Sequence, residues 1–263
     1  MQRPLAVWVA VQRPLTVGVA VQRPLTVGVA VVGALVMAGT QIAIPLSTRR
    51  AGLSSVVVVG LAVGAIGFTA AAWGWARAAI AALLVGPAAL LAEIVGTRTG
   101  WPFGQYRYTG MLRPTIGGVP AIVPLAWLGM GLAAWELAGW LTPHRLARIA
   151  VGAVALAGWD LFLDPQMTRE RFWVWPGGGF YRHVPVSNYV GWLVCAAAVM
   201  VLLGLVLPGA RRSPPLLGLY AWMAVMETLG FAVFFGDLVV ALVGGVVMVP
   251  LAATAGRRVL APA

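Results

Sequence analysis

Eight long apolar segments set the strongest limit on what this chain can fold into. Each is long enough to cross a bilayer as a helix, because about 20 apolar residues span the hydrocarbon layer. The segments are residues 25–46, 53–75, 78–97, 120–141, 146–164, 187–207, 215–236 and 238–256. Only Gly236 and Asp237 separate the last two, which form either a tight hairpin or a re-entrant pair. The sequence therefore predicts an all-α, polytopic helical membrane protein with seven or eight transmembrane helices, a multi-pass protein of the cell membrane.

The composition agrees with a membrane protein and indicates which kinds of molecule the chain contacts. The chain is 61% hydrophobic and 10% charged, which lies outside the range of soluble domains. Its 18 basic residues are all arginine, and they are scattered between the apolar segments instead of forming one patch. Scattered arginines are typical of contacts with lipid headgroups, so we expect membrane lipid as a partner and no nucleic acid.

A ten-residue repeat fills the N-terminus, where QRPLAVWVAV is followed by two copies of QRPLTVGVAV. The period is too short for a solenoid repeat, and each Arg-Pro pair interrupts the apolar run. We expect residues 1–24 to be a low-complexity segment without fixed structure. Residues 25–256 are expected to form a single transmembrane domain, and residues 257–263 a short basic tail.

Carboxylates at membrane depth are the next informative feature. The stretch WDLFLDP contains Asp160 and Asp164, which share one face of a helix because they are four residues apart. Glu93 ends the third apolar segment, and alternation of the helices places it on the same side of the membrane. Acids are rarely kept inside transmembrane helices without a function. We therefore predict a catalytic site at that side, with Glu93, Asp160 and Asp164 as its acids.

Two long connections, residues 97–119 and 165–188, emerge on the predicted site side. Both are rich in glycine, proline and aromatic residues, and ordered loops of this length are more often functional than simple connectors. An aromatic pocket would keep a carboxyl group protonated and would stabilise a cation. A plain interfacial aromatic belt is the alternative, and Asn188 either caps a helix or orients water. The predicted substrate-binding residues are Phe103, Tyr106, Tyr108, Trp173, Trp175, Tyr181, Asn188 and Trp192.

The aspartate pair has three interpretations. It can be an acid pair in which repulsion keeps one member protonated, a ligand for Mg²⁺-diphosphate, or a structural pair for Arg169 or Arg171. Glu227 is interpreted as a buried partner for an arginine. With two histidines, one cysteine and no nucleotide-binding motif, the chain lacks the ligands of common redox cofactors. We therefore expect no cofactor and no metal.

The site segments together resemble the membrane carotenoid hydratase family, which includes γ-carotene 1′-hydroxylases and bisanhydrobacterioruberin hydratases. The resemblance covers about residues 30–255. It departs from the family pattern at His183, where glycine is usual, and at Tyr189, where phenylalanine is usual. The matching residues are Glu93, Gly96, Gly100, Phe103, Gly104, Tyr106, Tyr108, Asp160, Asp164, Pro165, Trp173, Trp175, Tyr181, Pro185, Asn188, Gly191 and Trp192.

The resemblance implies a cofactor-independent carotenoid 1,2-hydratase that adds water to the terminal double bond of an acyclic carotenoid. In that reaction we expect Asp160 or Asp164 to donate the proton and the other to hold the negative charge of the pair. Glu93 is expected to orient water or relay protons. A hydrophobic carotenoid is the expected substrate, and contact with other enzymes of the pathway is expected.

Three alternatives remain open from the sequence. A carotenoid end-group cyclase starts with the same protonation, but an internal double bond captures the cation. A membrane prenyltransferase would bind Mg²⁺ and diphosphate through the aspartates. A non-enzymatic transporter or scaffold is the third, and it predicts internal repeats across the helices.

Overall fold

The computed structural model describes residues 6–209 and 211–261, with side chains described from residue 23 onward. Within these residues, eight helical segments are long and apolar enough to cross a membrane. This confirms the predicted all-α, polytopic membrane fold and gives eight spans instead of seven. The helices are α1 (Ala6–Ala43), α2 (Arg50–Trp73), α3 (Trp75–Thr99), α4 (Ile122–Leu141), α5 (Arg145–Arg169), α6 (Val186–Val206), α7 (Pro214–Leu229) and α8 (Leu238–Leu260).

Two short helical segments extend these helices. The 3₁₀ turn η1 (Ile44–Leu46) follows α1, and the π-helical turn η2 (Gly230–Phe234) follows α7. Helices suit a bilayer because every backbone polar group is satisfied within the segment.

The predicted domain boundaries, at residues 24 and 256, can be compared with the ends of helices α1 and α8. Helix α1 begins at Ala6, but residues 1–5 and the side chains of residues 6–22 lie outside the described part. The expectation of a separate unstructured segment over residues 1–24 therefore stays a prediction. Helix α8 continues to Leu260, so the segment predicted as a basic tail begins inside a helix.

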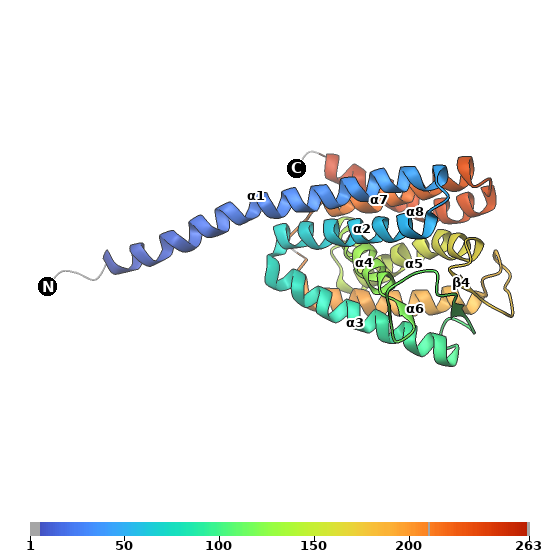
Figure 1. The fold of residues 1–263 in the computed structure, drawn as a ribbon. Coiled ribbons are helices and arrows are strands. Elements are labelled where there is room, and N and C mark those ends of the chain that lie inside the picture. Colours follow the sequence, from blue (N-terminus) through green and yellow to red (C-terminus); the bar gives the residue numbers. More distant parts are fainter. Residues whose placement is uncertain (1–5, 210, 262–263) are drawn as a thin grey trace.

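Helix α4 forms the centre of the bundle. In its most apolar stretch of 18 residues, 89% of the residues are buried inside the protein. The helix contacts α2, α3, α5, α6, α7 and α8. Helix α1 lies along α2, and its N-terminal part projects beyond the other helices (Figure 1). Because protein surrounds α4 on all sides, polar groups at its ends must find partners inside the bundle.

Close contact between α1 and α2 depends on glycines. A Cβ added at Gly60 would lie 2.8 Å from the carbonyl oxygen of Gly33, and one at Gly67 would lie 2.7 Å from the Cβ of Ala30. Small residues allow two membrane helices to approach closely enough for their backbones to touch. The first two helices are therefore packed through backbone contact instead of interlocking large side chains.

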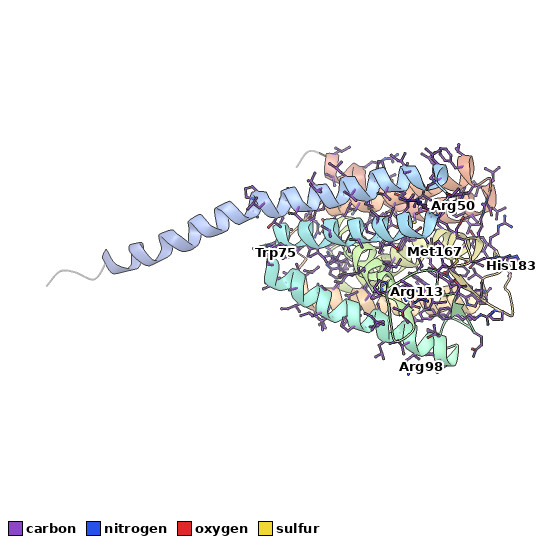
Figure 2. The ribbon with its side chains drawn as sticks, viewed as in Figure 1. Arg50, Trp75, Arg98, Arg113, Met167 and His183 are labelled. Carbon is purple, nitrogen blue, oxygen red and sulfur yellow. The ribbon has the colours of Figure 1, made fainter. Side chains whose placement is uncertain are left out.

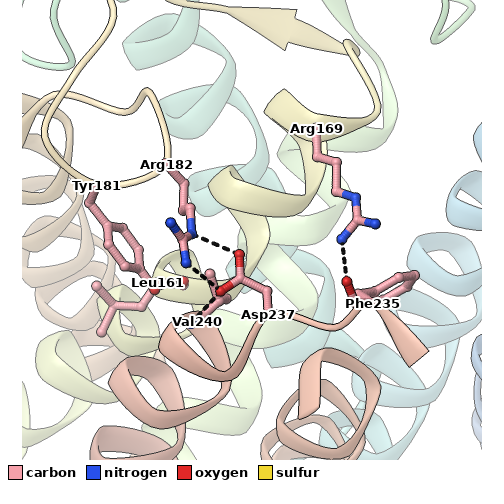
Figure 3. Close-up of polar contacts among 7 residues, drawn as sticks. All are labelled: Leu161, Arg169, Tyr181, Arg182, Phe235, Asp237 and Val240. Atoms are coloured by element: carbon pink, nitrogen blue, oxygen red, sulfur yellow. Dashed lines mark hydrogen bonds and ion pairs between the residues drawn. The ribbon is translucent and has the colours of Figure 1, made fainter. Parts of the chain in front are cut away.

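Helix α5 is longer than predicted. The sequence indicated an end at residue 164, before Pro165, but the helix continues through this proline to Arg169. Proline has no N–H to donate to the carbonyl four residues earlier. The Tyr181 hydroxyl donates to that carbonyl, Leu161 O, at 3.1 Å (Figure 3). A contact between distant segments thus satisfies the group that a helix of this sequence leaves unpaired.

Both long connections lie at one end of the bundle and are joined there. Strand β1 (Arg107–Tyr108) pairs antiparallel with β4 (Trp173–Val174), and β2 (Thr115–Ile116) pairs with β3 (Val119–Pro120). Figure 2 shows Arg98 and His183 toward this end and Trp75 at the other. The expectation that the two loops emerge on the same side is therefore confirmed.

Candidate active site

A small cavity of about 60 Å³ lies beneath the joined loops. We call it the acid cavity, because two of the predicted acids, Glu93 and Asp164, line it. Helices α2 to α6 and both loops contribute to its wall. The other lining residues are Ser54, Val58, Phe103, Tyr106, Tyr108, Leu112, Ile122, Val123, Ala126, Trp127, Leu163, Met167, Trp173, Trp175, Asn188 and Trp192.

Glu93 is held by three hydrogen-bond donors. One oxygen, Oε2, accepts from the Tyr106 hydroxyl at 2.5 Å and from the Tyr108 hydroxyl at 2.7 Å. The other, Oε1, accepts from the indole N–H of Trp127 at 3.2 Å. Glu93 is 5% exposed, and neither salt bridge within the described residues involves it. Three neutral donors around one carboxylate stabilise a negative charge without a cation.

The two tyrosines act as donors in this arrangement. Burial, and next the negative charge of Glu93, raise the pKa of Tyr106 and that of Tyr108 above the usual range of tyrosine. Both hydroxyls therefore keep their protons throughout the pH range in which proteins are stable.

Asp160 and Asp164 are joined by a single amide group. The Asn188 Nδ2 donates to Asp160 Oδ2 at 2.9 Å and also to Asp164 Oδ2. The indole N–H of Trp173 donates to Asp164 Oδ1 at 2.8 Å. Both aspartates are buried, and Asp160 Oδ1 has no partner among the described residues. The pairing of the aspartates with Arg169 or Arg171 is therefore wrong, because an amide and an indole are their partners.

Asn188 does not cap its helix. Pro185 is the residue that precedes α6, and Asn188 lies in the first turn with its side chain turned toward α5. The N-cap interpretation is therefore wrong. The Asn188 N–H₂ group lies between the two carboxylates, where a shared cation would otherwise lie.

The paired loops bring an aromatic donor to Glu93 and another to Asp164. Tyr108 and Trp173 are partners across the β1–β4 ladder, with ring centroids 5.7 Å apart in an edge-on arrangement. Trp175 stacks on Tyr106 at 5.6 Å, and its indole N–H donates to the Phe103 carbonyl at 3.0 Å. The loops are therefore fixed to one another and to the acids at the same time.

Two glycines make room for the ring of Phe103. A Cβ added at Gly96, on α3, would lie 2.6 Å from this ring, and one at Gly191, on α6, would lie 2.9 Å from it. Phe103 is 1% exposed. The first loop can fold back onto α3 only because neither helix carries a side chain at these positions.

Trp127 is a site residue that the sequence did not reveal. It donates to Glu93, and its ring stacks on Trp192 with centroids 4.1 Å apart. Trp127 lies near the start of α4, within an ordinary apolar segment. No polar neighbour or motif marks it, so nothing in the sequence distinguishes it from a packing residue.

Tyr181 is separate from the other predicted residues. It does not line the acid cavity, and its hydroxyl is occupied by the Leu161 carbonyl. His183 is exposed on the same loop, with φ +69°. Tyr189 contacts the Tyr181 ring edge-on, and its buried hydroxyl has no partner among the described residues. Glycine at position 183 and phenylalanine at position 189, which the resemblance implies are usual there, would avoid the left-handed backbone strain and the unpaired hydroxyl.

Three of the four remaining acids have side-chain partners outside the acid cavity, and the fourth, Glu136, accepts from the backbone N–H of Ser213 at 2.7 Å. Asp237 forms an ion pair with Arg182 at 2.7 Å and accepts from the backbone N–H of Val240 (Figure 3). Glu170 forms an ion pair with Arg50. Glu227 accepts from Gln41 at 3.0 Å, so the interpretation of Glu227 as a partner for an arginine is wrong.

Comparisons with known proteins show which family the chain resembles. The family model described as carotenoid biosynthesis protein matches residues 51–256. Bisanhydrobacterioruberin hydratase of Haloarcula japonica is 35% identical over 115 residues, which are 42% of this chain. The match spans 39% of the length of that relative. No solved structure matches the chain.

Proposed function

Since the chain belongs to the carotenoid biosynthesis protein family, we propose that it adds water to the terminal double bond of an acyclic carotenoid. The observation that supports this most is the convergence at one aromatic cavity of Glu93 and Asp164, which shares the Asn188 amide with Asp160. The Haloarcula relative is named as a hydratase, which gives further support.

The reaction needs a proton, a water molecule and a site that tolerates a cation. A proton moves from a carboxyl oxygen to the less substituted carbon, and the electrons of the double bond form the new C–H bond. The tertiary carbon is left positive, and a water oxygen then bonds to it. The water gives up a proton to the carboxylate, which restores the acid. In this proposal the chain needs no cofactor.

Asp164 is proposed as the acid that meets the substrate, because it lines the cavity while Asp160 lies behind it. Two negative charges bound to one amide group in an apolar region would repel strongly. The pair therefore holds at least one proton. When Asp164 gives up a proton, the N–H groups of Trp173 and Asn188 stabilise the carboxylate that remains.

Glu93 is proposed to stabilise the cation from the opposite wall. Its three donors stabilise the carboxylate whenever it is ionised, and a negative charge at this place would lower the energy of a nearby carbocation. The aromatic faces of Trp127, Trp192 and Trp173 surround the same cavity and add the attraction of ring electrons for positive charge.

A carotenoid is too apolar to arrive through water, so the proposed substrate enters from the lipid. We further propose that the chain resides in the cell membrane. Its substrate is then the hydrocarbon end of a lipid-dissolved polyene, and contact with other enzymes of the pathway would pass such substrates along.

Expression in bacteria that accumulate lycopene tests the proposal. Pigments that gain one water per reacted end, measured by mass spectrometry, are the expected product. Cells with the empty vector serve as the control. Pigment of unchanged mass with a shifted absorption spectrum would indicate a cyclase, and unaltered lycopene would contradict the proposal.

A further inference from the structure

A second cavity, of about 90 Å³, lies between α1, α2, α5 and α7. We call it the Glu227 cavity. Gln41 Nε2 donates to Glu227 Oε1 at 3.0 Å, and the Trp222 indole donates to Gln41 Oε1 at 2.9 Å. Glu227 is 8% exposed. Apart from Glu227, Gln41, Gln166, Ser54 and the Trp159 indole, the lining of this cavity is apolar or methionine.

The two cavities share part of one wall. Four residues line both, namely Ser54, Val58, Leu163 and Met167. Ser54 is the polar member of this group, and its side chain is buried, with 8% of the residue exposed. A hydroxyl that borders both spaces can donate to one side and accept from the other.

The Ser54 hydroxyl makes no hydrogen bond to the backbone of its own helix, which lies wholly within the described residues. The next residue on α2, Ser55, donates to the Ala51 carbonyl at 3.0 Å. Within the described part of the chain, the Ser54 hydroxyl has no such bond. A buried hydroxyl without a protein partner is expected to bind a polar ligand, because leaving it unpaired is unfavourable.

The Glu227 cavity also approaches the charged edge of the bundle. Phe235 lines it, and the guanidinium groups of Arg50 and Arg169 lie 5.9 and 5.6 Å from the centre of this ring. Arg169 also donates to the Phe235 carbonyl at 2.7 Å (Figure 3). Charged groups retain water at this edge, whereas aromatic rings of the joined loops cover the acid cavity.

We propose that the Glu227 cavity binds the water consumed in the reaction, and that Ser54 passes it to the acid cavity. A buried water needs about 10–15 Å³ of free space and two to four polar partners, and Glu227, Gln41 and Ser54 supply these. The inference rests on the proposed function. It makes Ser54 and Glu227 positioning residues for water, separate from the acids that move the proton.

The test uses isolated membranes that contain the full chain, supplied with lycopene in D₂O. In D₂O the acid delivers a deuteron to the double bond. A cation that meets no water and instead loses an ordinary hydrogen from a carbon next to the positive centre leaves deuterium in the recovered hydrocarbon. Ser54→Val is expected to lower the alcohol at least about tenfold, as one lost hydrogen bond of about 1.4 kcal/mol implies. Deuterium uptake into recovered lycopene should persist in this variant.

Two further variants separate the water path from folding. Ser54→Thr has the size of the valine variant but keeps a hydroxyl, so it should recover part of the alcohol. Ser55→Val changes the neighbouring serine, which lines neither cavity, and should match the wild type.

Four outcomes would overturn the water path or the function. The water path fails if Ser54→Val forms as much alcohol as the wild type. It also fails if the valine and threonine variants at position 54 lose the same amount of alcohol. Loss of deuterium uptake together with alcohol would also overturn it. A wild type that forms neither product would refute the proposed function and this inference with it.

Discussion

Tyr108 and Trp173 face each other across the β1–β4 ladder, and each donates a hydrogen bond to a different acid. The Tyr108 hydroxyl binds Glu93, which is on α3, and the Trp173 indole binds Asp164, which is on α5. Two residues that pair across separate loops therefore hold Glu93 and Asp164 at the same cavity. This cross-link makes the position of each acid depend on the other loop.

Replacing Asp164 by asparagine should abolish most of the activity. Asparagine keeps the shape and one acceptor oxygen but has no proton to donate to an alkene, so we expect a loss on the order of 100-fold or more. Alcohol formed from lycopene measures the effect. Asp237→Asn is the matched control, because Asp237 pairs with Arg182 outside the cavity. Undiminished alcohol from Asp164→Asn would remove Asp164 from the mechanism.

Removing the shared amide should weaken activity through the aspartates. Asn188→Ala removes the amide donor that Asp160 and Asp164 share, and an unsatisfied buried group costs about 1–3 kcal/mol. We expect lower thermal stability in detergent and less alcohol. Ser187→Ala changes the exposed neighbour and should affect neither. If Asn188→Ala behaved like the control, the amide would not hold the pair.

Adding one methyl group at Gly96 should displace the first loop. A Cβ there meets the Phe103 ring at 2.6 Å, and overpacking of this kind costs about 1–3 kcal/mol. We expect Gly96→Ala to lower both the melting temperature and the alcohol yield. Gly86→Ala is the control on the same helix, since nothing lies within 4 Å of a Cβ at Gly86. A melting temperature as low in the control would show that the effect is not specific to Phe103.

Glycine at position 183 should stabilise the loop. His183 has φ +69°, and a left-handed backbone costs an ordinary residue about 1–2 kcal/mol. We therefore expect His183→Gly to raise the melting temperature and to leave alcohol formation intact. His144→Gly is the comparison, because His144 has φ −71° and should gain nothing. An equal gain in both variants would contradict the explanation.

The ion pair between Arg182 and Asp237 should contribute stability that depends on pH. Burial raises the pKa of Asp237, but the hydrogen bonds from Arg182 and Val240 outweigh it and lower the pKa below the ordinary 3.8. Because the folded pKa is the lower one, the contribution is fully present above pH 3.8 and is lost as the pH falls through the folded value.

Asp237→Asn isolates this pair, since asparagine remains a good N-cap for α8. The melting temperature of this variant should be slightly below that of the wild type at neutral pH, because partly exposed pairs contribute about 0–1 kcal/mol. The difference should shrink as the pH falls below 3.8 and the Asp237 carboxylate takes up a proton. A difference that persists in acid would mean that Asp237 acts through something other than its charge.

The sequence predicted the acids and most of the aromatic wall, because spacing and helix alternation place them at one end. Glu93, Asp164 and Asn188 meet there as expected, whereas Trp127 was missed, as was Ser54, for which we propose a role in binding water. Both lie in apolar segments, and what they contact depends on which helices are neighbours. The end of α5 was missed for a similar reason, since the partner of the Leu161 carbonyl is Tyr181 on a later loop.

The order of the site residues along the chain has a consequence for biogenesis. Both aspartates emerge from the ribosome before Trp173 and Asn188, which are their N–H donors. A nascent chain that stops after α5 would carry two buried carboxyl groups into the lipid with no donor to receive them. Membrane insertion of the fifth helix should therefore remain incomplete or reversible until α6 has been synthesised and has docked against it.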